Sequence, residues 1–237
     1  MQAVRNTDVQ RNVRKGIKVF VDVAMLLDLA LLVTRSLTGS AVHEWLGIGF
    51  FVLAIAHNLL NRAWWRALFR GRWTPLRAVV AVPILLLVAM GVVMLLTIGP
   101  LTTVLPLRLP SPLGVWTTRS VHAGIACWIY VLTQFHVGTH CGRDLRSWWR
   151  SAKNSARLFS AVACLALLAL GVYDFVVMGF PVHLAFAYGF TGIAVDAPVA
   201  YGVLEVLLAG FPFAFLGALA RVLSGRGARS GVGVTER

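Results

Sequence analysis

Histidine is the residue type in this chain whose number and spacing could do chemistry. His43 and His57 are 14 residues apart, and so are His122 and His136. On a helix, 14 residues make close to four turns, so each pair shares one face and spans about 21 Å. Two parallel helices of this kind offer two facing imidazoles at each of two levels, as bis-imidazole ligation of two haems requires. We predict that His43 and His122 hold an outer haem, and His57 and His136 an inner one.

The two remaining histidines leave alternatives open. His140 follows His136 by one turn on the same face, so either could be the inner ligand; His136 keeps the 14-residue match and is the one we expect. The other would bind a propionate, carry protons or line a quinone pocket. His183 lies in an expected outer loop, at the surface or interface. Zinc and copper are disfavoured, because they need three or four ligands in one shell.

Six apolar stretches are long enough to carry these histidines through a lipid bilayer. The 237-residue chain is 58% hydrophobic and 13% charged, and about 20 apolar residues cross the hydrocarbon core. We predict an all-α integral membrane helical bundle with a di-haem four-helix core, comprising a basic segment (1–18), a transmembrane domain (19–224) and a flexible tail (225–237). The expected spans are 19–37, 43–65, 76–98, 118–141, 157–178 and 198–222.

The distribution of positive charge predicts the orientation of these spans. If the N-terminus is cytoplasmic, 19 of the 22 Lys and Arg residues fall in cytoplasmic segments, and only Arg35, Arg108 and Arg119 fall on the other side. Cytoplasmic loops of membrane proteins carry such an excess. We therefore predict a multi-pass protein of the inner (cytoplasmic) membrane with both termini inside. The net charge of +13 then needs no nucleic acid, because the basic residues are spread over four segments.

Several stretches resemble one family. These are TGSAVHEWLGIGFFVLAIAHNLLNR at 38–62, FRGRWTPLR at 69–77, RSVHAGIACWIYVLTQFHVGTH at 119–140 and, more weakly, GVYDF at 171–175. They are similar to motifs of the flavinylation-associated cytochrome family, bacterial membrane proteins similar in plan to four-helix di-haem cytochromes b. The resemblance covers most of the chain and is most specific at the two histidine motifs. It departs at Cys141, where the family has Trp.

The resemblance implies two non-covalent b-type haems on His43, His57, His122 and His136, with His140 as a further motif histidine. It implies electron transfer, often with an extracytoplasmic protein that carries covalent flavin. The electron source or sink on the other side would be the quinone pool or an inner donor. The alternative function is a haem-free transporter, or a membrane scaffold or anchor subunit of a larger complex.

Other residues are candidates for supporting roles. Arg119 lies one turn before His122, where it could bind a haem propionate or anchor the helix at the interface. Carboxylates within spans need partners or water; these are Asp22, which is close enough to the cytoplasmic edge to snorkel, and Asp28, Asp174 and Glu205. Small residues on the second and fourth spans should allow close helix packing; these are Gly47, Gly49, Gly124 and Gly138.

Catalytic and covalent motifs add nothing further. The three cysteines, Cys127, Cys141 and Cys164, form no CxxC or CxxCH, which disfavours a disulfide framework and covalently attached haem. Nucleotide-binding, metalloprotease and serine-hydrolase signatures are absent from the sequence. Whether the protein is an electron-transfer component or a membrane subunit of an oxidoreductase is left open.

Overall fold

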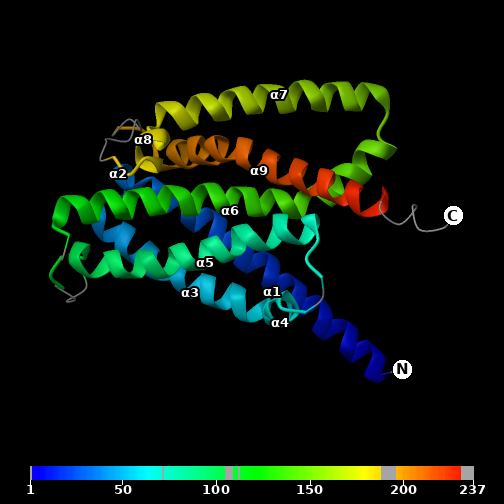
Figure 1. Cartoon of the computed structure of the whole chain (residues 1–237), viewed down its shortest axis with the longest axis horizontal. Helices are drawn as coiled ribbons and strands as arrows, with labels where there is room; N and C mark the ends of the chain where they lie inside the picture. The colour runs from blue at the N-terminus through cyan, green and yellow to red at the C-terminus, as the bar shows by residue number, and fades with distance from the viewer. Residues whose placement is uncertain (1, 71, 105–108, 112, 188–195, 231–237) are drawn as a thin grey trace. The chain divides into compact units, whose positions relative to one another are not determined.

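The protein is all-α in a computed structural model that describes residues 2–70, 72–104, 109–111, 113–187 and 196–230. Nine helices and no strand occur in these residues (Figure 1). The chain divides into two compact units, the first comprising Met1–Gly71 with Val195–Val203 and the second Arg72–Ala194 with Leu204–Arg237. The expected tail overlaps helix α9 up to Ser230, and residues 231–237 lie outside the described residues.

The first unit is built on two long helices, α1 (Gln2–Val33) and α3 (Ser40–Leu60), which pack against each other. The short helix α2 (Arg35–Thr38) joins them, and Gly39 reverses the chain with a φ of 84°, a conformation that glycine adopts without strain. Helix α3 ends at Asn61, and α4 (Arg62–Leu68) follows. The second expected span, 43–65, is therefore interrupted where α3 ends.

The second unit contains α5 (Pro75–Leu101), α6 (Val115–Ser151), α7 (Asn154–Val177), α8 (Phe180–Leu184) and most of α9 (Val199–Ser230). Helix α5 begins as its sequence predicts, with Thr74 Oγ1 accepting from Arg77 N at 3.3 Å and Pro75 in the first turn. It packs along α6. At 37 residues, α6 runs about 55 Å, well beyond the expected span 118–141.

Glycines bring α6 and α9 into main-chain contact. A Cβ added to Gly138 would lie 1.8 Å from the Ala214 carbonyl oxygen, and one added to Gly217 would lie 2.0 Å from that of Phe135. Gly124 allows a similar but less close approach of α8, because a Cβ added there would lie 2.9 Å from the carbonyl oxygen of His183. The packing role predicted for Gly138 and Gly124 is thus confirmed. Gly47 has nothing within 4 Å of its Cβ position.

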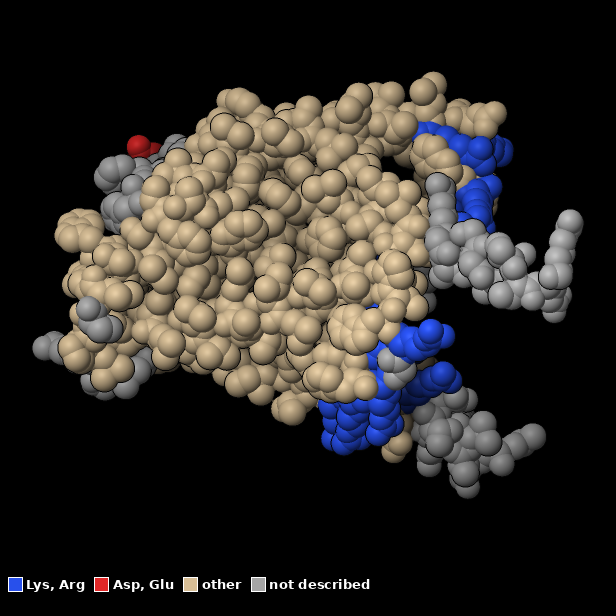
Figure 2. Space-filling model, viewed as in Figure 1, with Lys and Arg blue, Asp and Glu red and all other residues tan. Residues whose placement is uncertain are grey.

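Among the described residues, four helices are long and apolar enough to cross a membrane: α3, α5, α7 and residues 199–225 of α9. Many of their apolar side chains are exposed; on α7, Phe159 is 76% and Leu165 68% exposed. The face in Figure 2 is largely uncharged, with lysines and arginines beside helix ends. The expected all-α membrane fold is thus confirmed for four candidate spans. Helices α1 and α6 are not among the four, because the apolar part of α1 carries the charged residues Lys18, Asp22 and Asp28, and α6 carries polar and histidine residues.

Candidate functional site

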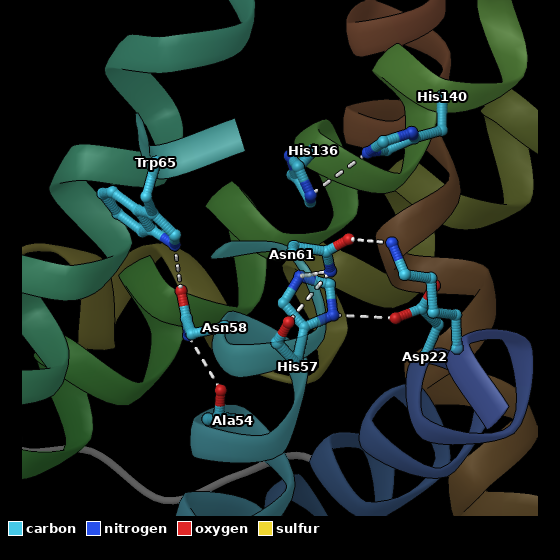
Figure 3. Close-up of polar contacts among 9 residues, drawn as sticks. Asp22, Ala54, His57, Asn58, Asn61, Trp65, His136 and His140 are labelled. Carbon is cyan, nitrogen blue, oxygen red and sulfur yellow. Dashed lines mark hydrogen bonds and ion pairs between the residues drawn. The ribbon is translucent and has the colours of Figure 1, made fainter. Parts of the chain in front are cut away.

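His57 lies on the last turn of α3, where α1 supplies its partner. Its Nδ1 is 2.7 Å from Asp22 Oδ1 (Figure 3). A carboxylate oxygen accepts, so the imidazole Nδ1 carries the hydrogen. The sequence prediction that Asp22 snorkels at the membrane edge missed this contact, which joins residues 35 positions apart.

Two amides hold the end of α3 around this ring. Asn61 Nδ2 donates to the His57 carbonyl at 2.9 Å and lies 3.4 Å from His57 Nε2, and Lys18 Nζ donates to Asn61 Oδ1 at 2.8 Å. Trp65 Nε1 donates to Asn58 Oδ1 at 2.9 Å, which ties α4 back to α3 (Figure 3). An amide N–H facing Nε2 agrees with an acceptor nitrogen there, the tautomer that Asp22 sets.

His43 lies in the first turn of α3, on the same unit. Its Nδ1 is 3.1 Å from the main-chain oxygen of Leu32 on α1. A carbonyl oxygen can only accept, so Nδ1 again carries the hydrogen and the neutral ring has its lone pair on Nε2. Both histidines of α3 are therefore oriented by α1.

His122 of α6 belongs to the second unit and is oriented by α5. Its Nδ1 is 2.9 Å from Thr97 Oγ1, and that hydroxyl donates its single hydrogen to the Met94 carbonyl at 2.7 Å. Thr97 is buried, at 6% exposure. With its hydrogen committed, the hydroxyl accepts from His122 Nδ1, and the lone pair is again on Nε2. Sequence reasoning missed Thr97 as a partner of His122, although it is the one hydroxyl-bearing residue of α5.

His136 and His140 contact each other, as one turn on a shared face predicts. Their Nε2 atoms are 3.3 Å apart, and the ring planes cross at 85° with centroids 4.7 Å apart (Figure 3). In such a contact between neutral rings, one Nε2–H donates to the lone pair of the other. The ring that donates through Nε2 then has a bare Nδ1, and the ring that accepts through Nε2 has its hydrogen on Nδ1. The choice of ligand between the two stays a prediction.

The donor chemistry of this set fits axial ligation of haem iron. Metal-bound histidines almost always donate their second ring N–H to a carboxylate, a carbonyl or another oxygen, which fixes the tautomer and the ring. His43, His57 and His122 each do so through Nδ1, which makes Nε2 the nitrogen that could bind a metal; at His57 the amide of Asn61, 3.4 Å from Nε2, would have to turn aside first. Within the described part of the chain, no three His, Cys, Asp or Glu side chains form a group that could hold a metal ion by themselves.

The other candidate residues have different surroundings. Arg119 is exposed, and its guanidinium lies 5.5 Å from the ring centroid of Trp116, one turn earlier on α6. Asp28 is 8% exposed on α1, and its Oδ1 has no hydrogen-bond partner among the described residues. Asp174 on α7 and Glu205 on α9 are half-buried. None of these contacts tests the propionate or proton roles.

The surface position expected for His183 is wrong. His183 lies in α8 and is 7% exposed, because Gly124 lets the α8 main chain approach α6. Trp128 Nε1 also donates to the Leu184 carbonyl at 3.1 Å. Burial lowers the pKa of His183 below its usual range, so the ring is buried in its neutral form.

Comparisons with protein families, with curated proteins and with solved structures find no match to this chain.

Proposed function

We propose that this protein transfers electrons across a membrane through two b-type haems. The observation that carries the proposal is the shared state of His43, His57 and His122. Each directs Nδ1 to a protein oxygen acceptor, which places the ring hydrogen of the neutral imidazole on Nδ1. Histidines that only pack between helices have no reason to share one tautomer, whereas metal ligands do.

The sequence spacing gives the ligand sets of the proposal. His43 and His122 hold the haem nearer the outer surface. His57 and His136 hold the haem nearer the cytoplasm, with His140 as the alternative to His136. Each iron supplies one-electron chemistry when the haem is bound. The chain supplies oriented imidazoles, and Arg119 is placed on α6 one turn before His122 to bind a propionate.

The proposed topology has six spans and both termini in the cytoplasm of a bacterial inner membrane. It adds α1 and α6 to the four apolar helices. Both carry more polar residues because they hold or orient the ligands: Asp22 lies on α1, and three candidate ligands lie on α6. Polar and ionisable groups in spans mark functional positions, so the charged residues of α1 and the polar residues of α6 are expected under this proposal.

The partners in the proposal come from the family resemblance. Electrons enter from the quinone pool or an inner donor, and they leave to an extracytoplasmic protein that carries flavin. The same path could run in reverse. No hydrolase or transferase chemistry is proposed, and the protein is an electron-transfer component or the membrane subunit of an oxidoreductase.

Visible spectroscopy of the purified full-length protein tests the proposal. The expected result is a sharp b-type α-band in the reduced-minus-oxidised spectrum, with two haems per chain. A protein that folds, purifies in detergent and carries no haem would overturn the proposal. That result would favour the haem-free transporter or the scaffold subunit.

A further inference from the structure

We propose that Asp22 is a positioning residue that sets the reduction potential of the haem held by His57 below that of the haem held by His43. The inference rests on the proposed function and deepens it, because it gives the two haems an order.

The three Nδ1 acceptors differ in charge. His57 faces a carboxylate, Asp22 Oδ1, at 2.7 Å, whereas His43 faces the Leu32 carbonyl at 3.1 Å and His122 faces the hydroxyl of Thr97 at 2.9 Å. Hydrogen bonds to an ionised acceptor are shorter and about twice as strong as those to a neutral one. The level of His57 therefore has a charged acceptor, and the level of His43 has neutral ones.

A carboxylate acceptor makes the imidazole a stronger ligand. It draws the Nδ1 hydrogen away from the ring and raises the electron density at Nε2, which raises the basicity of the ligand. A more basic ligand stabilises ferric over ferrous iron and lowers the potential. Neutral acceptors at His43 and His122 exert a smaller effect, so the haem at that level has the higher potential.

The contact is held from several sides. Asp22 and Lys18 lie one turn apart on α1, and Lys18 Nζ donates to the amide of Asn61 at 2.8 Å, next to the His57 ring. A single turn of α1 therefore positions both the carboxylate and the amide at the end of α3. Asp22 is 53% exposed, which keeps its acceptor available to the ring without a large desolvation cost.

The order has a direction. With haem bound at both levels, one electron would pass from the lower-potential level, held by His57, to the higher-potential level, held by His43, and no bond or proton would be transferred. In the proposed function, a quinol or an inner donor would reduce the level of His57, and an outer flavin would oxidise the level of His43.

Redox titration of the purified, haem-containing protein, followed by its visible spectrum, tests the order. The wild type should show two one-electron waves. His43→Ala, which retains the haem of His57, should show only the lower wave, and His57→Ala should show only the upper one. Asp22→Asn should raise the lower wave and leave the upper wave in place, while Asp22→Glu should restore it. Asp28→Asn is the matched control, because it makes the same substitution on α1 away from the His57 ring.

The possible outcomes distinguish the role of Asp22, the order of the two potentials and the proposed function. Two haems whose waves do not move in Asp22→Asn would overturn the role of Asp22 and leave the proposed function standing. The reverse order of waves in the two single-haem variants would overturn the proposed order even if Asp22→Asn failed to fold. An equal shift in Asp28→Asn would show a general field effect and also overturn it. A wild-type protein without haem is the separate result that refutes the proposed function.

Discussion

Gly138 on α6 faces α9 so closely that a single methyl group should separate the two helices. The Cβ of Gly138→Ala would lie 1.8 Å from the Ala214 carbonyl oxygen, 2.6 Å from its carbon and 2.9 Å from its Cα. A carbon and a carbonyl oxygen in contact are normally about 3.3 Å apart. The helices must therefore move apart by about 1.5 Å, and a main-chain atom cannot turn aside as a side chain can.

The expected cost follows from the packing and the helix propensity. Overpacking costs about 1–3 kcal/mol and occasionally more. Because the added Cβ of α6 would meet main-chain atoms of α9, which cannot rotate away, we expect a cost of about 3 kcal/mol for this substitution. Alanine is a better helix former than glycine by about 1 kcal/mol. The net loss of unfolding free energy in Gly138→Ala should be about 2 kcal/mol. Gly91→Ala on α5 is the matched control, because nothing lies within 4 Å of its Cβ position.

Unfolding of the purified protein in mild detergent, titrated with sodium dodecyl sulfate and followed by circular dichroism, measures both variants. Gly138→Ala should unfold at less denaturant than the wild type, and Gly91→Ala should unfold at the same or more. Gly217→Ala should behave like Gly138→Ala, since its Cβ would lie 2.0 Å from the Phe135 carbonyl oxygen. The double variant should lose less than the sum, because one separation relieves both clashes. Equal midpoints for Gly138→Ala and Gly91→Ala would refute the close packing of α6 and α9.

Three further predictions concern topology and ligands. In a background without native cysteines, cysteines placed at Arg70 and at Pro110 should be labelled from opposite sides of the membrane; labelling from one side contradicts six spans. His43→Ala should lose about half of the haem while the other haem keeps its potential; two haems with unchanged spectra would show that His43 is not a ligand. In electron paramagnetic resonance, the low-spin bis-histidine signal of the inner haem should be lost in His136→Ala and kept in His140→Ala. The opposite pattern would make His140 the ligand.

Membrane helices could be predicted from the sequence where apolar residues alone determine them. Helices α5, α7 and α9 begin within three residues of the predicted span starts at 76, 157 and 198. The second span was predicted too long, because the apolar pattern continues past Asn61, where the side-chain amide bonds back to His57 and α3 ends. The C-terminal extension of α6 to Ser151 was missed because its polar residues resemble a loop in hydropathy, although they form a continuous helix.

The hydrogen-bond acceptors of the histidine rings could not be predicted from the sequence. The face shared by His136 and His140 follows from helical periodicity, and their contact agrees with it. The acceptors are different, because pairing Thr97 with His122 or Asp22 with His57 requires knowledge of which helices are neighbours and in which register they pack. The acceptor of His43 is a main-chain oxygen, which leaves no signal in residue type.

The main-chain acceptor at Leu32 has a consequence for mutational tolerance. Every amino acid at position 32 carries the same carbonyl group, so no side-chain substitution there removes the acceptor of His43 while α1 keeps its path. Thr97 and Asp22 differ, because a single codon change at either position deletes the acceptor. Genetic drift at these three positions should therefore be uneven: position 32 can vary among apolar residues, whereas positions 22 and 97 are constrained by the histidines that they orient.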